Sequence, residues 1–136
     1  MISITMRKPD GSPHRLLPLR RRQIPDLGTA EARRCTQCRK TSGHYVAATQ
    51  CEAKDMSLEA ETLTWFQSSE VAERGFCGRC GSNLFWRRFG NEHVSIFAGT
   101  VDGKTGLRME TQIHADSKGD YYDLPECTIV DQRSLK

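Results

Sequence analysis

The chain has 136 residues, a length that fits one domain rather than two. Hydrophobic residues make up 37% and charged residues 27%, which is a globular balance, and no apolar run approaches the roughly 20 residues of a membrane-spanning helix. The N-terminus lacks the apolar stretch of a secretory signal, so we expect a cytoplasmic protein. The net charge of +3 comes largely from the arginines between Arg15 and Arg34. Such a local cluster is usually a solvated or disordered tail, which makes nucleic-acid binding the less favoured interpretation.

The first part of the chain carries little signal for regular structure. Residues 1–34 contain Pro9, Pro13, Pro18 and Pro25 and show neither the two-residue nor the 3.6-residue apolar period. We therefore predict an irregular segment over residues 1–34 and one domain over residues 35–130.

From Tyr45 onward, short stretches rich in β-branched and aromatic residues predict strands over 45–51, 63–68, 82–87 and 93–98. Turn signals lie between them at Gly75, Gly81, Phe89–Asn91 and Asp102–Lys104. Residues 109–114 and 121–122 are candidates for one or two more strands, and only residues 57–61 hint at a helical turn. This spacing predicts an antiparallel, all-β domain.

Two Cys-x-x-Cys pairs are the main chemical signal. In a reducing compartment, Cys35/Cys38 and Cys77/Cys80 are better explained by metal or redox chemistry than by a disulfide framework. Two thiolates at this spacing can bind one tetrahedral Zn²⁺ where the backbone turns tightly, as Gly78 and Gly81 permit. Nearby cations, Arg39, Lys40 and Arg79, favour the ionised thiols. We predict zinc at these four cysteines.

Other interpretations stay open. A redox Cys-x-x-Cys is less favoured because no βαβ pattern surrounds either pair. Cys51 and Cys127 are expected to be small buried hydrophobes or idle thiols. His44 could contact a ligand, whereas surface or structural roles are expected for His93 and His114.

Three motifs carry a family resemblance: Cys35-Thr-Gln-Cys-Arg-Lys-Thr-Ser-Gly43, Arg74-Gly-Phe-Cys-Gly-Arg-Cys-Gly-Ser-Asn-Leu84 and Ala98-Gly-Thr-Val-Asp102. In order and spacing, from about Cys35 to Pro125, the chain resembles the glutathione-dependent formaldehyde-activating enzyme family, also called the centromere-protein-V-like family. The resemblance implies a zinc-bound β-tent of stacked antiparallel sheets. It also implies a carbon–sulfur lyase acting on adducts of glutathione, or a related thiol, with an aldehyde.

The resemblance further implies two zinc sites. Cys35 and Cys38 match two of three thiolates at a catalytic zinc with an open fourth position, and Arg39 and Lys40 would meet substrate carboxylates. Cys77 and Cys80 match half of a structural site whose other ligands come from an N-terminal Cys-x-Cys.

The chain departs from this pattern upstream of Cys35. Arg33 and Arg34 stand where the catalytic motif has Cys-His, and the N-terminal Cys-x-Cys-Gly is missing. One hypothesis is a frameshift or a mis-called start, because one possible coding of Leu17–Gln23 yields Cys-Leu-Cys-Gly in another frame. The other is a genuinely divergent N-terminus.

Two functions follow. The first is a lyase-like protein acting on a thiol–aldehyde adduct such as S-hydroxymethylglutathione, with activity reduced by the lost ligands and about one zinc bound at most. The second is a non-catalytic module in which Cys35, Cys38, Cys77 and Cys80 share one closed Cys₄ zinc site, while Arg20–Arg22 touch nucleic acid or a protein.

Overall fold

The computed structural model describes residues 6–7, 13–14, 28–56 and 62–130. Its strands are β1 (Met6–Arg7), β2 (Pro13–His14), β3 (Thr29–Arg33), β4 (Val46–Glu52), β5 (Leu63–Ser69), β6 (Ala72–Cys77), β7 (Asn83–Arg88), β8 (His93–Phe97), β9 (Arg108–Ile113) and β10 (Thr128–Val130). The helices are α1 (Thr36–Ser42) and the short 3₁₀ turns η2 (Ala53–Asp55), η3 (Ala98–Thr100) and η4 (Ala115–Ser117).

Eight of the strands form one sheet in the order β10-β9-β3-β4-β8-β7-β6-β5. This confirms the all-β class and the strands predicted from Tyr45 to Phe97 and over 109–114. The sheet is not purely antiparallel, because β9 pairs in parallel with both β3 and β10. Five strands lie between β3 and β9 in the sequence. A connection of that length allows β9 to run either parallel or antiparallel to β3.

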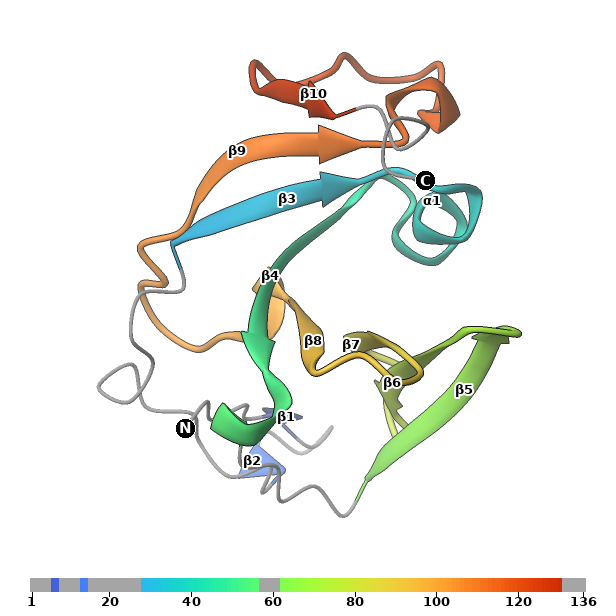
Figure 1. The fold of residues 1–136 in the computed structure, drawn as a ribbon, viewed down its shortest axis with the longest axis vertical. Coiled ribbons are helices and arrows are strands. Elements are labelled where there is room, and N and C mark those ends of the chain that lie inside the picture. Colours follow the sequence, from blue (N-terminus) through green and yellow to red (C-terminus); the bar gives the residue numbers. More distant parts are fainter. Residues whose placement is uncertain (1–5, 8–12, 15–27, 57–61, 131–136) are drawn as a thin grey trace.

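The sheet has two arms that meet at β4. In Figure 1, β9 and β3 run together with β10 beside them, whereas β8, β7, β6 and β5 follow on the other side of β4. We call these groups the β3 arm and the β6 arm. The β6 arm is a run of antiparallel neighbours, with β5 paired to β6 and β6 to β7.

Two clusters of buried side chains hold this sheet together. Leu84, Phe85, Val94 and Ile96 form the first, with Cys51 packed against it, in agreement with the expected hydrophobic role of Cys51. The second joins Cys38 of α1 to Val46, Ala48 and Phe97. The second cluster fixes the helix, and with it the first cysteine pair, on the sheet.

Strand β3 lies inside the segment predicted to be irregular. Thr29–Arg33 occupies an interior place in the sheet, between β4 and β9, and Ala32 is fully buried. The ordered sheet thus begins before Cys35, the expected domain boundary. The sequence signal for strand β3 is weak because Ala30 and Ala32 alternate with charged residues, and alanine has little preference for strands. Most of the remaining N-terminal segment, and the helical turn expected over 57–61, lie outside the described residues.

Helix α1 was not predicted from the sequence. Cys35 caps its start, and Gly43 ends it in the left-handed conformation at φ 71°, with its N–H donating to the carbonyl of Arg39 at 2.8 Å. The segment 121–122 is not a strand; Tyr121 and Tyr122 instead donate hydroxyl hydrogen bonds to the carbonyls of Gly43 and His44. In the part of the chain that the structure describes, no helix is long and apolar enough to cross a membrane.

Candidate functional site

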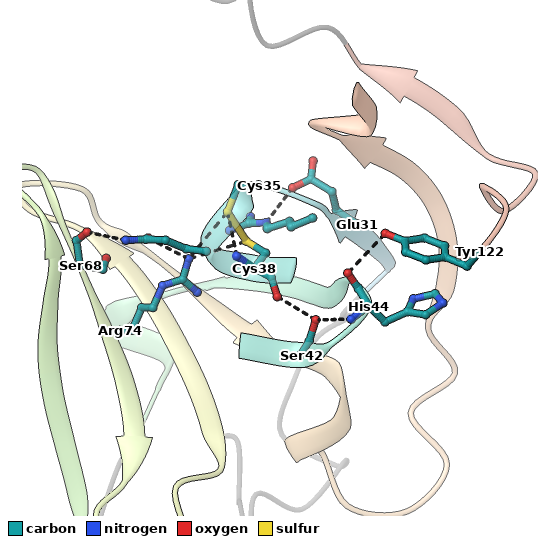
Figure 2. Close-up of a disulfide and its surroundings, with 10 residues drawn as sticks. Glu31, Cys35, Cys38, Ser42, His44, Ser68, Arg74 and Tyr122 are labelled. Carbon is teal, nitrogen blue, oxygen red and sulfur yellow. Dashed lines mark hydrogen bonds and ion pairs between the residues drawn. A yellow bond between two sulfur atoms is a disulfide. The ribbon is translucent and has the colours of Figure 1, made fainter. Parts of the chain in front are cut away.

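The first cysteine pair sits at the start of α1, facing the β6 arm. Cys35 and Cys38 are joined by a disulfide, and their Cα atoms are 5.1 Å apart, well within the range such bonds span. The backbone N–H of Cys38 donates to Cys35 Sγ at 3.2 Å. Figure 2 shows this disulfide between the β3 arm and Arg74 of β6. Cys38 is buried, whereas Cys35 is partly exposed.

A pocket of about 400 Å³ opens beside the disulfide, and we call it the disulfide pocket. Both arms line it, since Glu31 and Arg33 belong to β3 whereas Arg74 belongs to β6. Its further lining includes Gln37, Gln50, Ser68, Trp86 and His114. The pocket therefore combines a sulfur pair with cations and amides, the kind of polar groups that orient a small ligand.

The side chain of Arg74 lies beside both sulfurs. Its Nη2 lies 3.9 Å from Cys35 Sγ and 3.7 Å from Cys38 Sγ, and it donates to Gln37 Oε1 at 3.4 Å. The residue is only 9% exposed, and its Nε has no hydrogen-bond partner. Burial, and then repulsion from Arg33, lower the pKa of the guanidinium. No carboxylate pairs with Arg74 among the described residues, so the site presents an uncompensated cation.

Arg33, the last residue of β3, and Arg34, which follows it, have different surroundings. Arg33 lines the disulfide pocket, where its Nε pairs with Glu31 Oε1 at 2.8 Å and its guanidinium lies over Trp86. Arg34 is fully buried, and its guanidinium lies 4.7 Å from the ring centroid of Tyr45. Successive side chains of a strand point to opposite faces, and of these two residues only Arg33 lines the pocket.

The second pair, Cys77 and Cys80, lies at the turn between β6 and β7. The turn closes through Gly81, which has φ 76° and donates its N–H to the Cys77 carbonyl at 2.8 Å. Burial would raise the pKa of Cys77, but hydrogen bonds with the Thr62 hydroxyl, the backbone N–H groups of Cys80 and Arg79, and the Cys80 side chain outweigh it and lower the pKa. These contacts favour the thiolate, the form that binds metals.

The donor sets do not match the two complete zinc sites that the resemblance implies. In the disulfide, the sulfurs of Cys35 and Cys38 are bonded to each other, and a guanidinium faces them. Among the described residues, which include both cysteine pairs, no three His, Cys, Asp or Glu side chains gather as a metal-binding group. The closed Cys₄ alternative requires all four sulfurs in one cluster, and the described residues do not gather them.

The remaining candidates are spread over the molecule. Arg39 and Lys40 lie in the last turn of α1 and do not line the disulfide pocket; Lys40 borders a neighbouring groove that also includes Gln37 and Arg74. His114 does line the disulfide pocket, and it has a left-handed backbone at φ 54°. A larger pocket of about 720 Å³, the Cys80 pocket, is lined by Cys80, Ser82, Gly99 and Asp102 among others.

Arg74 was not among the site residues predicted from the sequence, and a surface or structural role was expected for His114. Arg74 belongs to the Arg-x-Phe-Cys motif, so a signal for it was present. The motif could not show that the Arg74 side chain contacts Cys38 of α1, because these two residues are 36 positions apart in the sequence.

Comparison with known proteins places the chain in a family. The sequence model described as "Glutathione-dependent formaldehyde-activating enzyme" matches residues 26–117, against about 35–125 expected from the motifs. A Schizosaccharomyces pombe protein named "Uncharacterized lyase C29B12.13" is 30% identical over 97 residues, which is 71% of each chain. A crystal structure of a Rhodobacter sphaeroides protein matches with a TM-score of 0.50 and 23% identity, over 60% of this chain and 76% of that chain, which shows a shared fold.

Proposed function

The chain belongs to the glutathione-dependent formaldehyde-activating enzyme family, and from this premise we propose that it is a carbon–sulfur lyase-like protein acting on adducts of a small thiol with an aldehyde. S-Hydroxymethylglutathione, the adduct of glutathione and formaldehyde, is the representative substrate. The observation that carries the proposal is the disulfide pocket, where the family's Cys-x-x-Cys meets the unpaired cation of Arg74. A cytoplasmic location, where small thiols keep proteins reduced, fits this substrate.

Cleavage of the adduct requires a group that stabilises the leaving thiolate and a base that accepts the hydroxyl proton. Cleavage of the adduct breaks the carbon–sulfur bond, leaves its electron pair on sulfur, and removes the hydroxyl proton as the carbonyl forms. A cation near the sulfur stabilises the departing thiolate, and Arg74 is placed for this role. His114 lines the same pocket and has a ring nitrogen that can accept the proton. The substrate's carboxylates would meet Arg33, with Arg39 and Lys40 on the adjoining helix.

We expect this chain to cleave the adduct slowly, because residue 33 is an arginine, whose guanidinium has no acceptor and cannot ligate a metal. Arg33→Cys adds a thiol on the pocket side of β3. After reduction of the disulfide, this variant should bind about one more zinc per chain and cleave the adduct at least tenfold faster. Zinc content is measured by mass spectrometry and adduct cleavage by NMR.

The matched control is Arg34→Cys, which adds the same thiol one residue later, where the native side chain is buried under Tyr45. It should gain neither zinc nor turnover. Equal gains in the two variants, or no gain in Arg33→Cys, would reject the placement of the catalytic site.

We also propose that Cys77 and Cys80 ligate a structural zinc, as two of its four ligands. The lowered pKa of Cys77 and the tight turn at Gly81 support this assignment. Cys80→Ser should lose zinc and lower the free energy of unfolding by several kilocalories per mole, because structural zinc supplies folding free energy. Cys127→Ser is the control. Unchanged zinc content and unchanged stability in Cys80→Ser would count against the assignment.

A further inference from the structure

The groove that Lys40 borders, next to the disulfide pocket, carries two aromatic side chains. It has a volume of about 350 Å³, and Phe66 of β5 and Phe76 of β6 lie in its wall. Phe66 is 59% exposed, and it belongs to neither of the two buried clusters. A cavity of about 150 Å³ already holds a benzene molecule, so this groove has room for a group of that size. We call it the phenylalanine groove.

The phenylalanine groove is continuous with the disulfide pocket, because Gln37 and Arg74 line both cavities. In the sheet, Arg74 pairs with Phe66 on one side and with Trp86 on the other. Directly paired residues place their side chains on the same face of a sheet, so these three form a row. Trp86 lines the disulfide pocket and Phe66 lines the groove, with Arg74 between them. A ligand whose sulfur lies in the disulfide pocket can therefore extend past Arg74 into the groove.

Helix α1 provides the opposite wall of the groove through Gln37 and Thr41, which lie one turn apart. Gln37 Nε2 donates to the Ser68 carbonyl at 2.9 Å, and Thr41 Oγ1 accepts from Asn83 Nδ2 at 2.8 Å. These bonds fix the helix against the strands, so the groove is formed before a ligand arrives. The contact of Arg74 Nη2 with Gln37 Oε1, at 3.4 Å, is longer than most hydrogen bonds, and a passing ligand can separate it at little cost.

The two cavities suit different ends of a thiol–aldehyde adduct. The disulfide pocket offers cations and amides, among them Arg33 and Gln50, which match the carboxylates and amides of glutathione. The phenylalanine groove offers two rings, which favour an apolar and preferably aromatic group. In the adduct, the substituent of the aldehyde is attached to the carbon next to sulfur. This substituent is therefore the part that can enter the groove while the sulfur stays in the disulfide pocket.

We propose that the phenylalanine groove binds the apolar substituent of the aldehyde, so that the chain favours adducts of phenyl-sized aldehydes over the adduct of formaldehyde. This specificity rests on the proposed lyase function and defines its substrate class. The bond changes stay the same: the carbon–sulfur bond breaks, its electron pair remains on sulfur, and the hydroxyl proton leaves as the carbonyl forms. The benzaldehyde adduct of glutathione thus yields glutathione and benzaldehyde. Formaldehyde has no substituent, and its adduct leaves the groove empty.

The test compares two unreactive thioethers, S-methylglutathione and S-benzylglutathione, by isothermal titration calorimetry. The native chain should bind S-benzylglutathione at least about tenfold more tightly, because its ring is buried in the groove. Phe66→Ala should weaken binding of S-benzylglutathione about tenfold and change binding of S-methylglutathione by less than about twofold. The second affinity shows that the variant is folded. Phe66→Trp, which keeps an aromatic ring, should retain the preference for S-benzylglutathione.

The matched control is Phe89→Ala, which removes another exposed phenylalanine, in the turn between β7 and β8 and outside the lining of the groove. It should leave both affinities unchanged. Equal binding of the two thioethers by the native chain, binding of neither, or an unchanged preference in Phe66→Ala would overturn the proposed specificity.

Cleavage of the adducts, followed by NMR, decides the lyase function separately. A chain that cleaves S-hydroxymethylglutathione but binds the two thioethers equally would reject the specificity and keep the lyase function. A chain that prefers S-benzylglutathione but cleaves neither the formaldehyde adduct nor the benzaldehyde adduct would reject the lyase function and keep the phenylalanine groove as a binding site.

Discussion

Arg33 and Arg34 are adjacent in the sequence but face different surroundings. Arg33 has a carboxylate partner and borders the disulfide pocket, whereas all three guanidinium nitrogens of Arg34 are buried without hydrogen bonds. The ring of Tyr45 offers Arg34 a cation–π contact, worth about 0.5–2 kcal/mol. That contact is smaller than the several kilocalories per mole needed to desolvate a charge. Arg34 should therefore weaken the fold.

Replacing the buried charge with an apolar side chain of similar length tests this view. We predict that Arg34→Met raises the free energy of unfolding by about 1–2 kcal/mol, measured by urea denaturation, because it removes the desolvation cost while filling most of the space. The control, Arg33→Met, breaks the pair with Glu31 and should lower stability or leave it unchanged. A clear loss of stability in Arg34→Met would mean that the guanidinium is compensated.

At the scale of elements, strand β6 shows why a glycine can mislead sequence analysis. Gly75 was interpreted as a turn signal, yet it pairs with Trp65 of β5 and Phe85 of β7 in the interior of the sheet. A Cβ built there would lie 3.1 Å from atoms of Leu63, Phe85 and Trp65. The glycine is needed because the core is tight at this point.

We predict that Gly75→Ala lowers the free energy of unfolding by about 1–3 kcal/mol, the usual cost of overpacking a core. Gly99→Ala is the control, because a Cβ at Gly99 meets no atom within 4 Å, and its stability should change by less than about 0.5 kcal/mol. Urea denaturation of both variants measures the difference. Equal stability of the two would show that the neighbours of Gly75 can move aside.

The elements also show what the sequence could predict. Strands with alternating apolar residues or with aromatic residues, such as β4 and β7, were predicted with ends that agree with the structure to within a residue or two. Strands β3 and β6 were missed because alanine, glycine and charged residues hide their period. The Cys-x-x-Cys spacing indicated that Cys35 and Cys38 lie together, whereas their zinc stays a prediction. The partner that faces them, Arg74, depends on long-range packing that local patterns do not encode.

At the scale of the whole molecule, helix α1 ties the two arms of the sheet together. Gln37 Nε2 donates to the Ser68 carbonyl at 2.9 Å, and Asn83 Nδ2 donates to Thr41 Oγ1 at 2.8 Å. Figure 2 shows the contact to Ser68 beside the one that Arg74 makes. These bonds join α1 to β5 and β7, and residues of α1, β3 and β6 line the disulfide pocket, so the site depends on the arrangement of the whole sheet.

The proposed function requires that the substrate binds in the disulfide pocket and not in the larger Cys80 pocket. The direct test is NMR titration of the native chain with S-methylglutathione, an unreactive analogue of the adduct. We predict shifts in the backbone amide of Gln37, the side-chain amide of Gln50 and the indole of Trp86, with saturation at millimolar concentration or below. Shifts confined to Ser82, Gly99 and Asp102, which line the Cys80 pocket, would contradict binding in the disulfide pocket.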